Sequence, residues 1–324
     1  MSTTFEVVVN SRIEAAQDIV CLELAAVAGE RLPDWSAGAH IDVYTRDAAG
    51  REVARQYSLC GPAGGDTWRI AVLDGPGGRG GSKWLHENAV AGQTVRVSAP
   101  RNHFGLYEER EPVILVAGGI GLTPLLAMAW KLSDNGVPFK LFYYVRRVVG
   151  AAFLQELGEA PFSTNTVVSV DESEAGALPL RQIFDNLQPD TRLYLCGPEG
   201  FMNAVIQEGL AQGLLAHRIH RELFATDSIT TQAGSNRAFD IVLKSNGRRI
   251  HVPPEQTAVQ ALAQAGIEVV MSCEQGLCGS CLTHVLEGVP EHRDQFMMPE
   301  EQARNDSFTP CCSRAKTACL VLDL

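Results

Sequence analysis

The sequence predicts a multidomain fold in which an antiparallel β-barrel, an α/β domain with a parallel sheet and a smaller α+β domain follow one another. Three observations predict this order. Short strand-like runs between Gly/Pro turns occupy the first third of the chain, strand and helix patterns alternate in the middle, and four cysteines with the spacing C-x4-C-x2-C-x29-C lie near the C-terminus. A chain of 324 residues is also too long for one ordinary core.

The first domain is predicted to span residues 1–108. Its apolar runs have the length of strands, and Gly/Pro turns separate them. Several antiparallel strands at this spacing are typical of a small β-barrel. The strand candidates are residues 5–9, 20–24, 40–44, 68–73 and 95–98.

The second domain is predicted to span residues 109–226. An apolar run at 112–116 leads into a glycine turn and a helical stretch over 124–132. Further strand candidates follow, each with a helical pattern after it. This alternation predicts an open parallel sheet with helices on both faces. These later strand candidates are residues 140–145, 165–170 and 192–196.

A polar stretch, ATDSITTQAGSN, follows at 225–236 and predicts a linker, which we assign to 227–236. The last domain then spans residues 237–324. It is predicted to open with a hairpin around Asn246-Gly247, followed by a helix over 258–265 and then the cysteine-rich loop.

The cysteine pattern predicts a [2Fe–2S] cluster, because the first three cysteines have the plant-type spacing. Gly276, Gly279 and Ser280 lie between them and would let backbone N–H groups face the cluster sulfurs. Structural zinc usually shows two close ligand pairs, and a disulfide framework is not expected in a chain of this length without a secretory signal. The predicted ligands are Cys273, Cys278, Cys281 and Cys311. Cys312 is the alternative for the fourth position.

Composition agrees with a redox enzyme of the cytoplasm. The N-terminus lacks the pattern of a signal peptide, and no apolar run approaches the length of a membrane span. A net charge of −11 argues against nonspecific binding to nucleic acid.

Two glycine turns in the second domain predict a dinucleotide crevice. Residues 118–124 and 196–202 each follow a strand and precede a helix. Glycines let the backbone approach a pyrophosphate, and the helix ends offer free N–H groups. Either turn alone is a weak signal, and the first departs from G-x-G-x-x-G. Two such turns at the carboxyl ends of strands in one sheet form a stronger signal.

The first domain carries a candidate phosphate site. Arg55 lies at a strand, and residues 78–82, GRGGS, begin an apparent helix at 83–87. A fixed guanidinium with backbone amides at a helix start would bind phosphate. From the residues alone, a solvated arginine beside a simple turn explains the pattern equally well.

These motifs together resemble the phthalate dioxygenase reductase family, of which vanillate O-demethylase reductases are close members. The resemblance rests on Arg55-x-Tyr57-Ser58, the turn at 118–124, Cys196-Gly197-Pro198 and the C-terminal segment 311–315, CCSRA. It covers essentially the whole chain in the family's domain order, with a plant-type ferredoxin (β-grasp) domain last.

The resemblance implies FMN, NADH and one [2Fe–2S] cluster as cofactors, and it assigns residues to the first two. For FMN these are Arg55, Gln56, Tyr57, Ser58, Ala71, Val72, Leu73, Gly80, Gly81, Ser82, Thr123 and Phe224. For NAD they are Gly118, Gly119, Gly121, Cys196, Gly197 and Pro198, with Cys196 near the nicotinamide. Asp171 is a further candidate, for a ribose hydroxyl, whereas Arg146 and Arg147 would suit the 2′-phosphate of NADPH.

The function implied is that of a reductase that takes electrons from NADH through FMN and the cluster to a Rieske-type aromatic oxygenase or O-demethylase. NADH gives two electrons at once and the cluster accepts one, so a flavin must stand between them. No catalytic acid or base is expected. We expect a monomer that binds neither nucleic acid nor membrane. The alternatives are a reductase for a monooxygenase of quaternary amines and a redox carrier that does not oxidise NADH.

Overall fold

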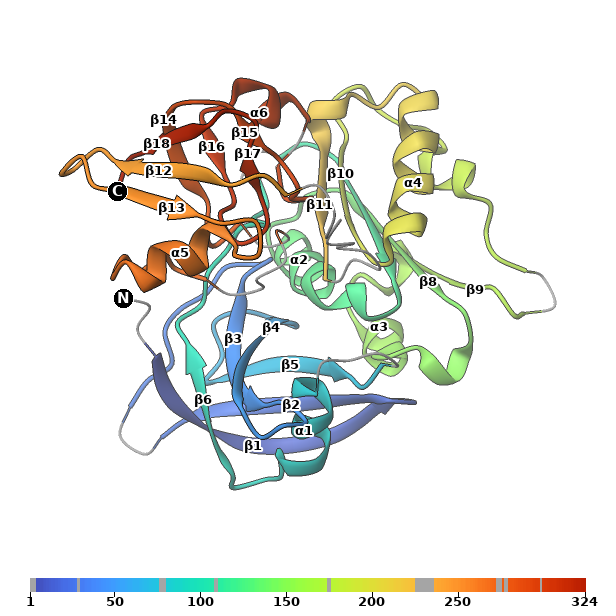
Figure 1. Cartoon of the computed structure of the whole chain (residues 1–324). Coiled ribbons are helices and arrows are strands. Elements are labelled where there is room, and N and C mark those ends of the chain that lie inside the picture. The colour runs from blue at the N-terminus through green and yellow to red at the C-terminus, as the bar shows by residue number, and fades with distance from the viewer. Residues whose placement is uncertain are drawn as a thin grey trace. The chain divides into compact units, whose positions relative to one another are not determined.

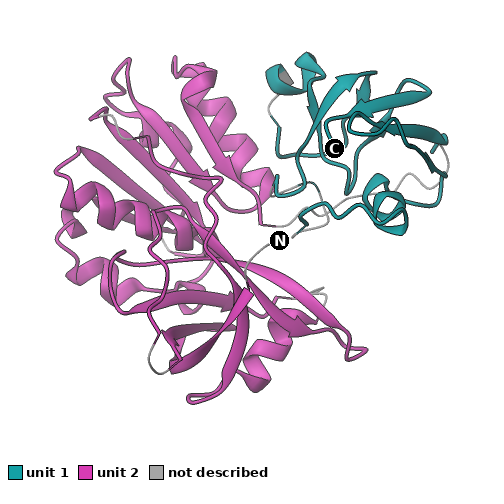
Figure 2. Ribbon diagram, turned by 90° about the vertical axis from the view of Figure 1, so that its left-hand side faces the viewer, with its two compact units in different colours: residues 1, 225–324 teal, residues 2–224 magenta. Residues whose placement is uncertain are grey.

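The computed structural model describes residues 4–27, 30–75, 80–107, 110–173, 176–224, 236–271, 276, 279–297 and 299–324. The chain divides into two compact units, a larger unit of residues 2–224 and a smaller unit of residues 225–324 (Figure 2). All four tryptophans belong to the larger unit. The predicted domain boundary at 108/109 and nearly all of the predicted linker lie outside the described residues.

The first half of the larger unit is an antiparallel six-stranded sheet with the order β4-β3-β6-β1-β2-β5 (Figure 1). A bridge between Leu59 and Ile70 connects its two edges, so the sheet curls around a core that includes Ile41 and Trp68. The strands are β1 (Thr4–Ala16), β2 (Ile19–Ala26), β3 (His40–Arg46), β4 (Glu52–Ser58), β5 (Thr67–Leu73) and β6 (Thr94–Ser98), and helix α1 (Gly81–Asn88) lies between β5 and β6.

The second half of the larger unit is a parallel sheet with the order β11-β10-β7-β8-β9. The strand order reverses between β7 and β10, which is where such sheets bind ligands. The strands are β7 (Val113–Gly118), β8 (Phe139–Val145), β9 (Thr166–Val170), β10 (Arg192–Cys196) and β11 (Ile219–Glu222). The helices are α2 (Leu122–Asp134), α3 (Leu154–Glu159) and α4 (Glu199–Ala211), with 3-10 turns η1 (Gly119–Gly121), η2 (Val148–Gly150), η3 (Ser163–Asn165), η4 (Leu180–Phe184) and η5 (Ala216–Arg218).

An ion pair joins the two halves of the larger unit. Arg69 of β5 donates to Glu156 of α3 at 2.8 Å, and the Trp130 indole donates to the same carboxylate oxygen at 2.9 Å. Burial by itself lowers the pKa of Arg69, but the hydrogen bond to Glu156 and nearby thiols and charges raise it above its usual value. The guanidinium also lies over the Phe153 ring, 5.1 Å from its centre.

The smaller unit has a mixed sheet with the order β13-β12-β18-β14-β16, in which only β12 and β18 run parallel. A capping box between Thr257 and Gln260 begins helix α5 (Ala258–Gln264), which packs on the sheet. The strands are β12 (Phe239–Leu243), β13 (Arg249–Val252), β14 (Thr283–Glu287), β16 (Ser307–Phe308) and β18 (Cys319–Leu322). A ribbon of β15 (Pro290–Glu291) and β17 (Arg314–Ala315) and helix α6 (Pro299–Arg304) complete the unit.

The observed sheets agree with the predicted fold class: an antiparallel barrel, a parallel sheet and a small mixed α+β unit follow one another (Figure 1). In the part of the chain that the structure describes, no helix combines the length and the apolar character needed to span a bilayer.

Candidate functional site

The predicted phosphate site is assembled around the start of α1. Gly80 caps this helix with a φ of 90°, a conformation that favours glycine. A Cβ on Gly81 would lie 2.6 Å from Cγ of Arg55 and 2.7 Å from Oγ1 of Thr45, so the arginine side chain passes directly over the helix start. This cradle, closed by a guanidinium and lined by backbone N–H groups, fits the phosphate of a flavin. Gly78 and Arg79 lie outside the described residues.

Tyr57 and Ser82 connect this cradle to strand β4. The Tyr57 hydroxyl donates to Oγ of Ser82 at 3.4 Å. Burial raises the pKa of Tyr57 to about 12, although Ser82 and Arg55 oppose the shift, so the phenol is neutral at physiological pH and can donate. Five of the predicted FMN residues therefore lie together: Arg55, Tyr57, Gly80, Gly81 and Ser82.

The remaining predicted flavin residues differ in their burial and in their hydrogen bonds. Nε2 of Gln56 lies 3.1 Å from Nε2 of His40. Ala71 packs outside the barrel core, whereas the Val72 side chain lies in that core and its carbonyl is 2.9 Å from a His86 ring nitrogen. Leu73 is exposed, as is Phe224 beyond the end of β11. Thr123 is buried, and its hydroxyl donates to the carbonyl of Ile120.

The two predicted glycine turns pack against each other at the carboxyl ends of the neighbouring strands β7 and β10. A Cβ on Gly197 would lie 2.9 Å from Cα of Gly118, and one on Gly121 would overlap the Cys196 carbonyl. A Cβ on Gly118 would be 2.9 Å from the Pro198 ring. Only glycine fits at these contacts, which bring the two turns together where the strand order reverses, the place at which such sheets bind dinucleotides.

Asp171 follows the edge strand β9 and is exposed, and its N–H donates to the carbonyl of Val145. Strand β8 separates it from the glycine turn that follows β7. Arg146 and Arg147, both exposed, follow β8 itself. Asp171, the candidate for a ribose hydroxyl, and Arg146 and Arg147, the candidates for a 2′-phosphate, thus lie at the ends of the adjacent strands β9 and β8.

Glu222 is a site residue that the sequence analysis did not single out. Oγ of Ser58 in the barrel donates to its carboxylate at 3.4 Å, although 164 positions separate the two residues. Glu222 is also paired in register with Cys196. Burial, followed by the charge of Glu222, raises the pKa of the Cys196 thiol well above its usual value, which keeps the thiol protonated. Only its position at the end of β11, two residues before Phe224, could have indicated Glu222.

The cluster site is described in part, because Cys273 and Cys278 lie outside the described residues. Cys281 and Cys311 are both buried and pack together with Val259 of α5. Hydrogen bonding to Cys281 and then to Cys312 raises the pKa of the Cys311 thiol. The side chain of Cys312 also turns to Thr309, whose Oγ1 lies 3.3 Å from its sulfur. Two of the predicted thiolates are therefore adjacent, which fits a cluster.

Gly276 and Gly279 are glycines for a packing reason. Both have a φ of 69°, and a Cβ would overlap the Cys312 sulfur at Gly276 and the Phe296 ring at Gly279. The N–H groups of Gln295 and Phe296 both donate to the carbonyl of Gly276 at 3.1 Å. Residues 295 and 296 thus hold the cysteine loop in place at Gly276 and Gly279. The expectation that backbone N–H groups of these glycines face the cluster sulfurs stays a prediction.

Known proteins are similar to this chain over nearly its whole length. Residues 241–316 match the 2Fe-2S iron-sulfur cluster binding domain. The vanillate O-demethylase oxidoreductase of Pseudomonas putida is 46% identical over 321 residues, which cover 98% of this chain and 99% of that protein. The structure of phthalate dioxygenase reductase aligns with a TM-score of 0.70 at 33% identity, over 99% of this chain and 98% of that one. The chain belongs to the phthalate dioxygenase reductase family.

Membership of the phthalate dioxygenase reductase family confirms the predicted resemblance, the fold class and the assignment as an electron-transfer oxidoreductase with flavin, pyridine-nucleotide and [2Fe–2S] modules. An intact type IV self-sufficient cytochrome P450 monooxygenase also aligns, with a TM-score of 0.87 at 35% identity, over 99% of this chain and 41% of that protein. The family's three-part arrangement therefore also occurs within a longer chain.

Proposed function

We propose that this chain is the NADH-dependent reductase component of a Rieske-type aromatic oxygenase or O-demethylase system, with FMN as its flavin, and that it acts as a monomer. When bound, this flavin would supply the chemistry that connects the nicotinamide, a two-electron hydride donor, to the cluster, a one-electron acceptor. The similarity to a vanillate O-demethylase oxidoreductase over nearly the whole chain supports an oxygenase as the partner.

The observation that carries this proposal is the junction between the barrel and the parallel sheet. The hydrogen bond from Ser58 to Glu222 lies where the flavin strand β4 meets the end of β11, and Cys196 ends the neighbouring strand. In the larger unit, a candidate flavin wall and a candidate nicotinamide turn therefore face one another. This is the arrangement that direct hydride transfer requires.

The residues act by binding and positioning. Arg55, Gly81 and Ser82 would hold the flavin phosphate, and Gly118, Gly121 and Gly197 would admit the pyrophosphate. Asp171 would accept a hydrogen bond from the ribose of NADH. The Ser58 hydroxyl donates a hydrogen bond to Glu222, and the Cys196 thiol stays protonated, so neither residue is proposed to act as a base.

The test combines three measurements on the purified full-length protein. Heat-released flavin should have the mass of FMN, anaerobic NADH should bleach it faster than NADPH does, and the reduced protein should then reduce the Rieske centre of a purified vanillate O-demethylase oxygenase. No bleaching by either coenzyme would indicate a carrier without NADH oxidation. Rapid bleaching without reduction of any Rieske partner would instead favour a different acceptor, such as a quaternary-amine or a haem monooxygenase.

A further inference from the structure

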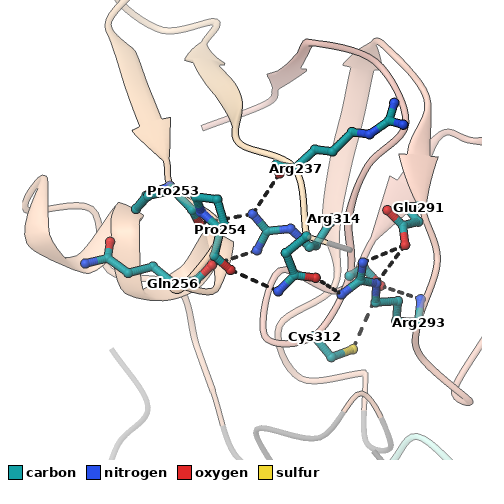
Figure 3. A network of polar contacts seen from close by, with 10 residues as sticks. Arg237, Pro253, Pro254, Gln256, Glu291, Arg293, Cys312 and Arg314 are labelled. Carbon is teal, nitrogen blue, oxygen red and sulfur yellow. Dashed lines mark hydrogen bonds and ion pairs between the residues drawn. The ribbon is translucent and has the colours of Figure 1, made fainter. Parts of the chain in front are cut away.

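Arg314 is a buried arginine whose hydrogen bonds all go to backbone carbonyls. The residue is 3% exposed. Its Nη1 donates to the carbonyl of Gln256 at 2.7 Å, and its Nη2 donates to those of Arg237 and Pro253 at 3.0 and 3.1 Å (Figure 3). The guanidinium also lies over the Phe239 ring, 5.2 Å from its centre.

These contacts attach the segment around Cys311 to the start of α5. The carbonyls of Pro253 and Gln256 belong to the turn that precedes this helix. On the other side of Cys311, the N–H of Val259 donates to the carbonyl of Pro310 at 3.1 Å. Since Val259 also packs against Cys281 and Cys311, the cysteine segment is fastened to α5 both before and after the proposed ligand.

The charge of Arg314 has no carboxylate in contact with it among the described residues. The neighbouring arginine, Arg293, differs in this respect, because it pairs with Glu291 at 2.6 Å (Figure 3). Burial, followed by the charge of Arg293, lowers the pKa of Arg314 from its usual value. An arginine nevertheless stays protonated in proteins. A full positive charge is therefore buried three residues from Cys311, where water screens it little.

We propose that Arg314 positions the Cys311 thiolate and that its buried charge raises the reduction potential of the cluster. Reduction adds one negative charge to the cluster, and a nearby cation in a medium of low dielectric constant stabilises that charge. The effect makes the cluster a better acceptor of electrons from the flavin. This inference rests on the proposed function only in taking Cys311 as a cluster ligand.

The experiment compares Arg314→Gln and Arg314→Lys in the full-length protein, with Arg249→Gln as a control. Arg249 lies in the same unit, but its side chain is 63% exposed and pairs with Asp240. Each protein is titrated with dithionite and mediators, and the reduced cluster is followed by its electron paramagnetic resonance signal. At a fixed potential, Arg314→Gln should lower the ratio of reduced to oxidised cluster about tenfold, which for one electron corresponds to about 59 mV. Arg249→Gln should change this ratio less than about twofold.

The lysine variant separates charge from positioning. It keeps the positive charge, so the ratio should stay within about threefold of the unmodified protein, but an ammonium cannot reproduce the planar set of donors. Loss of the cluster to a chelator should therefore be about fivefold faster in Arg314→Lys. An unchanged ratio in Arg314→Gln would refute the role of the charge, and unchanged cluster loss in both variants would refute the positioning.

If Arg314→Gln does not retain the cluster, the lysine variant decides: a tenfold fall in its ratio, despite the retained charge, would overturn the proposal. Because the titration needs neither NADH nor an oxygenase, its failure is distinguishable from failure of the proposed function. Turnover of NADH with ferricyanide, which takes electrons from the flavin, should be unchanged in all three variants.

Discussion

Each of the two compact units contains an arginine whose guanidinium is at least half-buried, and the groups that contact this charge differ between the units. Arg69 of the larger unit pairs with a carboxylate, and its pKa is raised despite the opposing effect of burial. Arg314 of the smaller unit donates its hydrogen bonds to backbone carbonyls among the described residues, and burial lowers its pKa. A carboxylate in direct contact thus compensates the charge of Arg69, whereas Glu291 and Glu255 act on Arg314 without a direct ion pair in the part of the chain that the structure describes.

Burial keeps several other groups of the larger unit neutral. Burial, with the charge of Arg101 second, lowers the pKa of His40 to about 4, and burial likewise lowers that of His220 to about 4. Burial keeps Tyr57 and Cys196 protonated. A hydride carries its own electron pair, so its transfer depends mainly on how the larger unit positions the nicotinamide and the flavin, and less on charged side chains. A centre that stores one added electron benefits from a fixed positive charge nearby.

The largest expected effect tests whether the two units work separately. Replacing Cys278 by serine should abolish the visible absorption of the cluster, because a thiolate ligand is lost. FMN should remain bound, and NADH–ferricyanide turnover should survive. The measurements are the absorption spectrum, the flavin content and the ferricyanide rate. Loss of FMN together with the cluster would mean that the units depend on one another and would break the comparison.

Acid should destabilise the larger unit through His40. Its folded-state pKa of about 4 lies below the value of 6.5 for a free histidine, so the unfolded chain binds a proton first as the pH falls. The contribution of His40 is complete above about pH 6.5 and is lost toward pH 4, by about 3 kcal/mol. Urea unfolding followed by tryptophan fluorescence measures this, since all four tryptophans report on the larger unit.

The matched variants for this acid effect are His40→Gln and His251→Gln. The first should flatten the dependence of unfolding free energy on pH between 4 and 6.5. The second should not, because His251 belongs to the smaller unit and is mostly exposed. An unchanged slope in His40→Gln would show that other groups cause the acid sensitivity.

Removing the counter-ion of Arg69 tests the compensation directly. Glu156→Ala leaves a half-buried guanidinium and the Trp130 indole without their shared acceptor, and should lower the unfolding free energy of the larger unit by about 2 kcal/mol. Replacing Arg69 by methionine in the same protein should recover at least half of this loss, because no unpaired charge then remains. If the double variant is as unstable as the single one, the acid acts by packing and not by its charge.

The smallest effect concerns Arg55, whose guanidinium donates to the carbonyl of Ala54 and is proposed to bind the flavin phosphate as well. Arg55→Ala should weaken the binding of FMN about tenfold more than that of riboflavin, since only FMN carries the phosphate. Titration of the flavin-free protein, followed by the quenching of flavin fluorescence, gives both dissociation constants. Equal weakening for the two flavins would place the phosphate elsewhere and leave Arg55 a structural role.

The sequence predicted those features that local chemistry determines. The cysteine spacing, the glycine turns and the alternation of strands and helices each constrain a short segment, and the observed strands lie close to the predicted ones. The structure extends the first strand through Ala16, because the polar residues after Val9 continue to pair with β2. It also adds helix α6, Pro299–Arg304, which the sequence analysis did not predict.

Contacts between distant segments could not be predicted in this way. Ser58 and Glu222 meet across the junction of two domains, and the carbonyls that bind Arg314 come from three separate positions. No periodicity or motif encodes such pairs. The proximity of Arg55 to Gly81, which supports a phosphate-binding role over that of a solvated arginine, likewise arises only in the fold.

The close contact of the two glycine turns has a consequence for changing the coenzyme. Because any side chain at Gly121 or Gly197 would collide with the backbone of the other turn, neither position can vary without moving both. If these turns bind the coenzyme as proposed, substitutions that change its preference are expected at the rim of the sheet instead. There Arg146, Arg147 and Asp171 are exposed, and their side chains can change without disturbing the turns. On the proposed assignment, a library built on these three positions is expected to alter the coenzyme preference.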